Sequence, residues 1–366
     1  MHMFVIGIAV ALASCAVQAP EENASKPDLD LAEMAATARR EADVPALGLC
    51  VLRRGAKPAV AVSGVRMAVS ETKVTPADAW HWGSISKSFT ATLVARLVEK
   101  GVVSWEDTIG ARLGDVVPDM RGDYRDVTFV HLLSHRSGIP ANIPIERFAE
   151  FQAPPANPIT DRLAWVKIAL AQKPKGPKQE TYEYSNSGYI VAGAMLEAAT
   201  DRSWEDLMKK EVFAPLGLAS AGFGPPRGST HDAQPRGHRN IKGIDLPVPA
   251  TADNPPALGP AGRIHMSLAD MARFLNAHAT RRSDFLSEAT YKQLHTKPFG
   301  GIYALGWVVT APEGRWHNGS NTMWYAEVAF NLTTGNVAAV VVNDGDIENV
   351  QPTVRALLQA LMKKQQ

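Results

Sequence analysis

Cysteine is scarce in this chain, and neither sign of charge is in excess. Its 366 residues include two cysteines, and 38 basic residues balance 37 acidic ones to a formal net charge of +1. No run of like charges occurs, so the electrostatic footprint of a nucleic-acid-binding protein is missing. With 45% hydrophobic and 20% charged residues, the chain can bury a large core, in one large domain or two subdomains.

Signatures of several enzyme classes are missing as well. There is no G-x-S-x-G elbow, which argues against an α/β-hydrolase. There is no H-E-x-x-H, and the ten histidines are dispersed, which argues against a zinc enzyme. Neither a phosphate-binding glycine loop nor a dinucleotide fingerprint occurs. The sequence therefore implies no metal and no cofactor.

The N-terminus has an apolar run of about ten residues from Phe4 to Ala13, which is the length of a signal-peptide core and too short to span a bilayer. The stretch Leu12-Ala13-Ser14-Cys15 resembles a bacterial lipoprotein processing site. It predicts a signal peptide over 1–14, a lipidated Cys15 and a flexible tether over 15–29. The protein would then be exported, as a periplasmic or membrane-tethered lipoprotein that meets the membrane only through its lipid anchor. The plainer alternative is an uncleaved apolar tail.

Cys50 would be the only thiol left if Cys15 is lipidated, so no internal disulfide could form. It lies inside the apolar run Leu47–Leu52. A lone cysteine in such a run is typical of a small core residue rather than a nucleophile.

Periodicity predicts an α+β fold, an α/β sandwich whose antiparallel sheet is flanked by N- and C-terminal helices. The expected helices at the two ends are 31–41 and 350–363, and the expected strands are 46–53, 57–65, 306–310, 324–332 and 336–343. Between them, a mostly helical subdomain is expected over 80–290, inserted between the two parts of a sheet subdomain, 30–79 and 291–366. The active site is expected at the interface of the two subdomains.

The middle of the chain has helical patterns separated by loops rich in proline and glycine. The patterns cover 87–100, 161–171, 186–200, 203–212 and 267–277. The longest loop, 222–259, is either disordered or helps to wall a site, since long loops in compact domains are often functional.

Two serines are followed three residues later by a lysine, Ser70 with Lys73 and Ser84 with Lys87. Pro76 opposes a helix after the first pair, so nothing there fixes the lysine beside the serine. After Ser84, apolar residues recur at helical spacing until Lys100-Gly101, which predicts one amphipathic helix.

On that helix Lys87 would reach back toward Ser84 at the first turn. Burial would lower the pKa of the ammonium, so that a neutral amine could take the hydroxyl proton of Ser84. The alternative is that Ser84 only caps the helix and Lys87 is solvated.

Two later segments offer partners for this pair. Tyr184-Ser185-Asn186 lies where a loop enters a helix; the phenol could share proton transfer, and the Asn186 amide could orient an acyl group or the lysine. His317-Asn318-Gly319-Ser320 precedes a strand, and a glycine at a sheet edge lets a substrate approach backbone N–H groups. The alternatives are a half-buried aromatic, a helix cap and a polar turn.

Taken in order, Ser84-x-x-Lys87, Tyr184-x-Asn186 and His317-x-Gly319 resemble the three motifs of the penicillin-recognising serine hydrolases. The similarity extends to 132–140, 215–218 and 259–263 and covers most of the chain. It points to the branch of class C β-lactamases, D-alanyl-D-alanine carboxypeptidases and family VIII carboxylesterases, and implies a β-lactamase/transpeptidase-like fold.

The resemblance implies an acyl-enzyme mechanism. Ser84 would be the nucleophile, Lys87 and Tyr184 would share general-base work, and Tyr184 would return a proton to the leaving group. The backbone N–H groups of Ser84 and Ser320 would form the oxyanion hole, and Asn186, His317 and Gly319 would contact substrate.

The third motif departs from class C β-lactamases, which carry lysine where this chain has His317. A fixed charge for a substrate carboxylate is thus missing, unless Arg315, two residues earlier, supplies it. Bulk at Met323 and Trp324 is expected to narrow the acyl pocket.

The resulting hypothesis is a carboxylesterase for small acyl esters with weak β-lactam hydrolysis. The alternatives are a class C-like β-lactamase or D-alanyl-D-alanine carboxypeptidase acting on β-lactam or peptide substrates, and a non-catalytic envelope binding protein.

Overall fold

The central sheet has six antiparallel strands in the order β2-β1-β11-β10-β9-β8. A computed structural model describes residues 30–228 and 232–363. The sheet strands are β1 (Ala46–Leu52), β2 (Ala59–Gly64), β8 (Val308–Val309), β9 (Gly314–Ser320), β10 (Tyr325–Asn331) and β11 (Val337–Val342). β1 and β11 are buried along their whole length, as expected of strands whose sequences are continuous apolar runs. The antiparallel sheet predicted from the two ends of the chain is confirmed.

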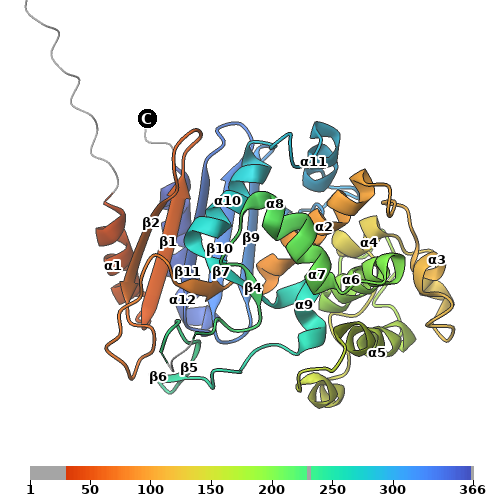
Figure 1. Ribbon diagram of the computed structural model, residues 1–366, viewed down its shortest axis with the longest axis horizontal. Coiled ribbons are helices and arrows are strands. Elements are labelled where there is room, and N and C mark those ends of the chain that lie inside the picture. The colour runs from red at the N-terminus through yellow and green to blue at the C-terminus, as the bar shows by residue number, and fades with distance from the viewer. Residues whose placement is uncertain (1–29, 229–231, 364–366) are drawn as a thin grey trace, which may run out of the picture. The chain divides into compact units, whose positions relative to one another are not determined.

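Helices cover both faces of this sheet. Helices α1 (Leu31–Glu41) and α12 (Ile347–Met362) contact each other and one face, while α10 (Leu268–Ala279) packs on the other (Figure 1). The expected α/β sandwich is therefore present. The boundaries proposed at residues 80 and 290 stay a prediction, and α10, which lies between them, packs on the sheet.

Strand β9 is not among the expected strands, and the sequence indicates only a sheet edge or a polar turn at 317–320. Its residues GRWHNGS alternate between half-buried and buried, and they pair with β10 from Ser320↔Tyr325 to Gly314↔Asn331. Two glycines and an asparagine give it little intrinsic strand preference. Pairing with the apolar β10 therefore decides its conformation.

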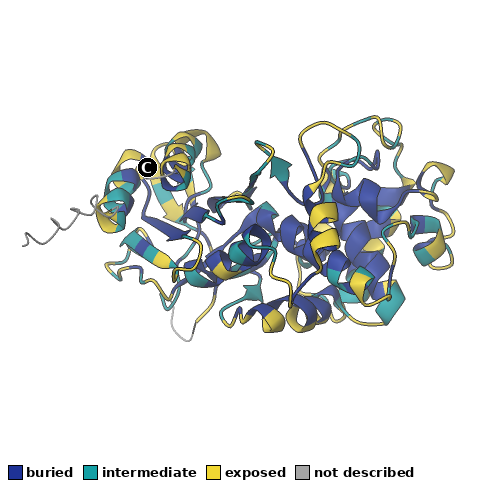
Figure 2. Cartoon of the chain, turned by 90° about the horizontal axis from the view of Figure 1, so that it is seen from above, coloured by how far each residue is buried: buried dark blue, intermediate teal, exposed yellow. Residues whose placement is uncertain are grey.

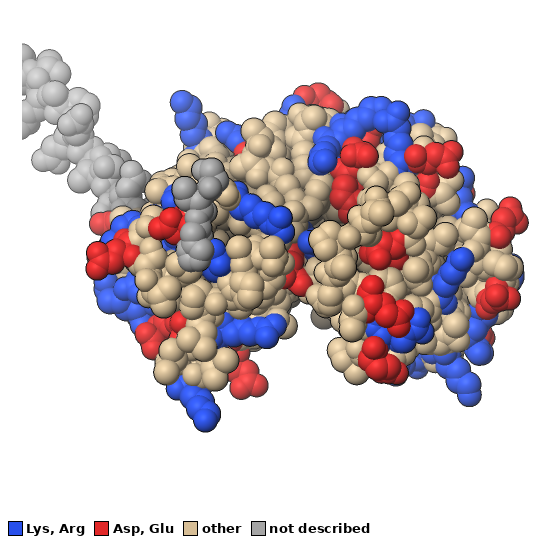
Figure 3. Space-filling view, turned by 60° about the horizontal axis from the view of Figure 1, so that its bottom comes forward, with Lys and Arg blue, Asp and Glu red and all other residues tan. Residues whose placement is uncertain are grey.

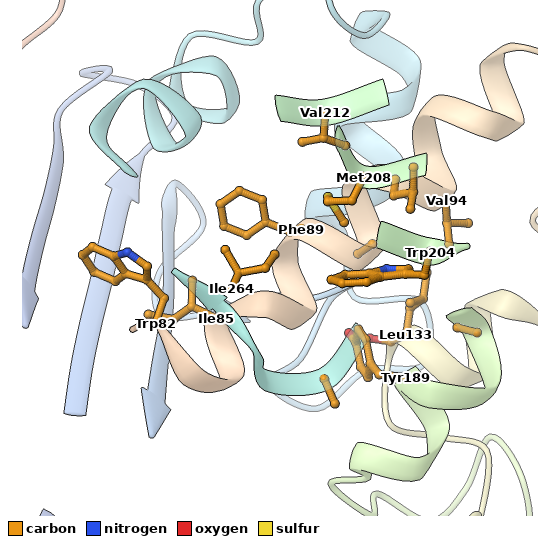
Figure 4. Close-up of a cluster of buried hydrophobic side chains, with 14 of the residues drawn as sticks. Trp82, Ile85, Phe89, Val94, Leu133, Tyr189, Trp204, Met208, Val212 and Ile264 are labelled. Atoms are coloured by element: carbon orange, nitrogen blue, oxygen red, sulfur yellow. The ribbon is translucent and has the colours of Figure 1, made fainter. Parts of the chain in front are cut away.

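The remaining helices lie in the middle of the chain together with α2 (Ser86–Glu99), which follows a 3₁₀ turn, η1 (Gly83–Ile85). They are α3 (Ile109–Leu113), α4 (Phe129–Leu133), α5 (Pro158–Ala171), α6 (Asn186–Thr200), α7 (Trp204–Met208), α8 (Ala214–Leu216), α9 (Gly259–Gly262) and α11 (Glu288–His295), with short 3₁₀ turns η2 (Gly122–Tyr124), η3 (Ile145–Phe151) and η5 (Pro256–Leu258) and a π-helical turn (Lys209–Phe213) between α7 and α8. Side chains from α2 and α7 meet in one apolar core (Figure 4), and buried residues extend through this part of the chain (Figure 2).

The expectation that α2 is amphipathic is wrong. Every residue from Ser86 to Ala95 is buried. Its hydroxyl groups bond to backbone carbonyls inside the protein: Ser88 donates to Gly306 O at 2.6 Å and Thr90 donates to Pro260 O at 2.7 Å. Because these polar groups are paired, the helix can be enclosed on all sides at little cost.

The long loop at 222–259 carries structure in its described part. It contributes β4 (Gly222–Phe223) to a small sheet with β3 (Ala79–His81) and β7 (Ile264–Ser267), and it forms a hairpin of β5 (His238–Ile241) and β6 (Ile244–Pro247). Disorder is therefore the wrong interpretation for these segments.

The surface charge matches the balanced composition of the chain. On the face shown in Figure 3, basic and acidic side chains are interspersed. Within 30–228 and 232–363, no helix has the length and apolar character needed to cross a bilayer.

Residues 1–29, with the predicted signal peptide, tether and Cys15, lie outside the described part. Cys50 is a buried core residue as predicted, and burial raises its pKa to about 12.

Candidate active site

Ser84 and Lys87 lie side by side, as their spacing predicted. Ser84 is the middle residue of η1 and Lys87 lies in the first turn of α2, so both point to the same side. Lys87 Nζ is 3.1 Å from Ser84 Oγ. Ser84 is half-buried and does not cap the helix, because the N-cap of α2 is Ile85. The interpretation of the pair as a cap and a solvated lysine is therefore wrong.

The Lys87 amine is fully enclosed and has only uncharged partners among its described hydrogen bonds. Besides Ser84, Nζ donates to Asn186 Oδ1 at 2.7 Å and to the Ala261 carbonyl at 2.8 Å. Because no carboxylate is among these partners, burial dominates and holds the pKa of Lys87 well below its usual value. A neutral amine in this position can accept the Ser84 proton.

Tyr184 lies over the same lysine, with Nζ 4.8 Å from the ring centroid. The residue as a whole is 36% exposed, but its hydroxyl is enclosed by protein atoms. This desolvation raises the pKa of the phenol well above its usual value, and contact with the Ser84 hydroxyl offsets part of the increase. Tyr184 is therefore a protonated phenol beside Ser84, suited to donating a proton.

Asn186 opens α6, but the residue that caps this helix is Ser185. Ser185 Oγ accepts from the N–H of Gly188 and donates to Pro140 O at 2.8 Å. The Asn186 amide therefore does not cap the helix and can contact the site. Its Oδ1 accepts a hydrogen bond from Lys87 Nζ, and its Nδ2 donates to Asn142 Oδ1 at 3.0 Å. Asn142 carried no motif that sequence reasoning could have used.

The end of β9 lies directly against η1. A Cβ added at Gly319 would be 2.0 Å from Trp82 O and 2.9 Å from Ser84 N, and one added at Gly83, where φ is +50°, would be 2.4 Å from Ser320 N. Only glycines allow such an approach of two backbones. The N–H groups of Ser84 and Ser320 are thereby brought to one place, and Ser84 N–H belongs to a first helical turn, where N–H groups lack intrahelical acceptors.

His317 lies on the inward side of β9, buried like Gly319 two residues later. Its Nε2 accepts from the Tyr303 hydroxyl at 2.7 Å, and its Nδ1 contacts Asn318 O at 2.5 Å. Burial lowers its pKa to about 3. The ring is therefore neutral and carries no fixed charge for a substrate carboxylate.

Arg315 shares this inward side but does not supply the missing charge. Its Nε and Nη2 donate to His295 O at 3.1 and 2.7 Å, and its Nη1 contacts Ala311 O, Pro312 O and Gly314 O. The guanidinium is occupied by backbone carbonyls, away from Ser84.

Met323 and Trp324 do not wall the acyl pocket, contrary to expectation. They are 3% and 2% exposed. Trp324 packs edge-on against Trp80, with ring centroids 6.1 Å apart. Met323 and Trp324 both pack against Gly237. Their bulk fills the core.

The competing pair does not assemble. Ser70 Oγ bonds to Thr72 and, at 3.3 Å, to the carboxylate of Asp232. Lys73 instead lies in a β-bridge with Val65.

Two further residues stand beside the site. His135, within the segment 132–140 that the resemblance singled out, has φ +59° and lies 4.3 Å from the Tyr184 ring centroid, and its Nδ1 accepts the Ser185 N–H. Tyr303, the partner of His317, lies 4.6 Å from His135 by ring centroids. Across the described residues no cluster of three or more His, Cys, Asp or Glu side chains could hold a metal.

The family model described as Beta-lactamase matches residues 31–361. The chain belongs to the beta-lactamase family. Among curated proteins, it is 29% identical over 330 residues to penicillin-binding protein 4 of Amycolatopsis lactamdurans, covering 84% of this chain and 83% of that one. It is 26% identical over 340 residues to an unguisins hydrolase of Aspergillus campestris, covering 86% of this chain and 61% of the fungal protein, so it spans less than two thirds of that relative.

Solved structures share this beta-lactamase-family fold at low identity. A penicillin-binding protein homologue from Pyrococcus abyssi has a TM-score of 0.73 at 22% identity, covering 92% of this chain and 78% of its own. A class C beta lactamase from Rhodobacter sphaeroides has a TM-score of 0.69 at 19% identity, covering 90% and 99%.

Proposed function

We propose that this protein is a serine hydrolase that works through an acyl-enzyme, and that its substrates are small carboxylic esters, with weak β-lactam hydrolysis. The observation that carries the proposal is the Lys87 amine, enclosed without a carboxylate partner and 3.1 Å from Ser84 Oγ. Such a lysine is neutral at a pH where a solvated one is charged. It is the base that a serine nucleophile requires.

Acylation begins when Lys87 takes the Ser84 proton and Oγ attacks the ester carbonyl. The developing oxyanion lies at the junction of η1 and β9, where the N–H groups of Ser84 and Ser320 stabilise it. Tyr184, kept protonated by its raised pKa, donates a proton to the departing alkoxide and recovers one through Lys87. Asn186 holds the amine in place throughout.

Deacylation uses the same groups in reverse order. A water molecule takes the place of the leaving alcohol, gives a proton to the Lys87 amine and attacks the acyl carbonyl. Lys87 then returns that proton to Ser84 Oγ as the acyl C–O bond breaks, which restores the resting site.

The preference for esters rests on His317. β-Lactams and D-alanyl-D-alanine peptides carry a carboxylate beside the reacting bond, whereas a small ester needs no counter-ion. A neutral His317, enclosed by Tyr303, offers no charge to such a carboxylate. The site is thus better matched to uncharged acyl substrates.

Amide hydrolysis is the second candidate, and the protonated Tyr184 favours it. An amine leaving group must be protonated as the C–N bond breaks, and a phenol beside Ser84 supplies that proton.

Export with a lipid anchor on Cys15 is part of the proposal and rests on the sequence of residues 1–15. It would keep the enzyme at the membrane surface, facing substrates outside the cytoplasm. Mass spectrometry of membrane-fraction protein, with Cys15→Ala as the comparison, tests it.

The test of function compares kcat/KM for a short-chain nitrophenyl ester, a chromogenic cephalosporin and a D-alanyl-D-alanine peptide. We expect the ester to be the best substrate; if it is the poorest, the ester assignment is wrong. Ser84→Ala should abolish turnover and labelling by a serine-directed phosphonate, while Ser70→Ala should leave both unchanged. Turnover that survives in Ser84→Ala would refute the site.

A further inference from the structure

A buried histidine–carboxylate pair lies behind Ser84, outside the proposed proton path. The side chains of His81, at the end of β3, and Asp253, in the long loop, are 0% and 2% exposed. His81 Nε2 is 3.1 Å from Asp253 Oδ1, and Nδ1 accepts the backbone N–H of Gly83 at 3.1 Å. Because Gly83 occupies Nδ1, the ring proton lies on Nε2 and faces the carboxylate.

The same carboxylate also holds the end of β9. Asp253 Oδ1 accepts from the side-chain amide of Asn321 at 2.8 Å, and Asn321 directly follows Ser320. Asn321 is 4% exposed, and its Oδ1 accepts the N–H of Met323 at 3.3 Å, which closes the turn after β9. One carboxylate is therefore connected to η1 through His81 and to the turn that follows β9 through Asn321.

Asp253 is kept as an anion. Its Oδ2 accepts from Arg263 Nε at 3.2 Å, and its Oδ1 accepts from Asn254 N at 2.7 Å. Burial alone would raise the pKa of this carboxyl, but the contacts with His81, Arg263 and Asn321 outweigh it, and the net shift is downward. A buried polar network with its members paired in this way is rigid.

The neighbouring residue adds a third connection. Asn254 Nδ2 donates to Gly262 O at 2.9 Å, next to Ala261, whose carbonyl accepts the Lys87 amine. The segment Asp253-Asn254 is thus linked to η1 through His81, to the turn after β9 through Asn321, and to α9 through Gly262.

We propose that His81 and Asp253 are positioning residues that set the spacing of the two oxyanion N–H groups, that of Ser84 through Gly83 and that of Ser320 through Asn321. This inference rests on the proposed acyl-enzyme function. Neither residue touches the substrate. They act by fixing two backbone segments that are far apart in the sequence.

Two substitutions at His81 separate its contacts. His81→Gln places an amide N–H toward Asp253 but removes the acceptor for Gly83 N–H, and His81→Asn keeps a short acceptor near Gly83 but does not reach Asp253. We expect kcat for the nitrophenyl ester to fall roughly 10- to 100-fold in His81→Gln, with KM little changed. Asp253→Asn should lower kcat in the same way, and His81→Asn should lower it less than His81→Gln.

A boronic acid that forms a tetrahedral adduct with Ser84 supplies a readout that a structural role would not move. Its affinity should fall by the same factor as kcat/KM, since it occupies the oxyanion site. His265→Gln is the matched control: His265 pairs with His81 across β3 and β7, and its Nδ1 contacts Gly224 O at 2.8 Å rather than Gly83. It should keep wild-type kcat and boronate affinity.

The outcomes separate this inference from the function it rests on. A wild-type protein without ester turnover or phosphonate labelling refutes the function. A wild-type protein that turns over ester, with His81→Gln at wild-type kcat and boronate affinity, overturns the positioning role. If His81→Gln does not fold, Asp253→Asn and Asn321→Ala decide by the same two measurements.

Discussion

Gly319→Ala tests the junction between β9 and η1 with one methyl group. The added Cβ would lie 2.0 Å from Trp82 O, where real Cβ contacts shorter than 3.0 Å are essentially never seen. The two backbones must therefore separate by about 1 Å, and a displacement of that size at reacting groups costs roughly 100-fold in rate. Because the contact is with backbone, no side-chain rotation relieves it. Overpacking of this kind should also lower the free energy of unfolding by about 1–3 kcal/mol.

The assay is kcat and KM for a short-chain nitrophenyl ester, with the rate of phosphonate labelling at Ser84 and the denaturation midpoint measured on the same preparation. Both kcat and labelling should fall together, because both need the oxyanion site. Gly122→Ala is the control, since an added Cβ there meets nothing within 4 Å. A folded Gly319→Ala protein with wild-type kcat would refute the placement of the oxyanion site between Ser84 and Ser320.

Two other substitutions test the charges around the site. Lys87→Met should abolish turnover and also change the pH dependence of stability. The unfolded lysine titrates near 10.5 and the folded one well below it, so the unfolded wild-type chain binds more protons than the folded one between these pKa values. The free energy of unfolding of the wild type should therefore rise with pH across that window relative to Lys87→Met. Urea denaturation at several pH values measures this, and identical slopes for the two proteins would contradict the lowered pKa. Arg315→Met should remove both guanidinium donors from the carbonyl of the buried His295, at a cost of about 1–3 kcal/mol, while KM for a carboxylate-bearing cephalosporin stays unchanged. A selective rise in that KM would show that Arg315 serves the substrate after all.

Local pattern was sufficient for most elements and for the first half of the site. The apolar runs of β1 and β11 and the spacing of Ser84 and Lys87 depend on residues close in sequence, so the sequence could predict them. Strand β9 could not be predicted in this way, because its polar, glycine-containing sequence becomes a strand only by pairing with β10.

Contacts between segments far apart in the sequence also explain the wrong prediction for α2 and the omission of His81. The serines and threonines of α2 suggest a solvated face, but they bond to carbonyls of distant segments such as Pro260. His81 and Asp253 are 172 residues apart in the chain, and no local motif connects them. Sequence reasoning found the residues of the three motifs, and it missed the residues that hold those motifs together.

The Lys87 amine relies on the main-chain oxygen of Ala261, and this limits how the strength of the base can be altered. No side-chain replacement at position 261 removes a backbone carbonyl. Only a movement of α9 can do so, and α9 is backed at Gly259 by Glu205 and Arg162. Substitutions in that charged cluster are therefore a route by which evolution or design could change the proton affinity of Lys87 while every residue of the three motifs stays the same.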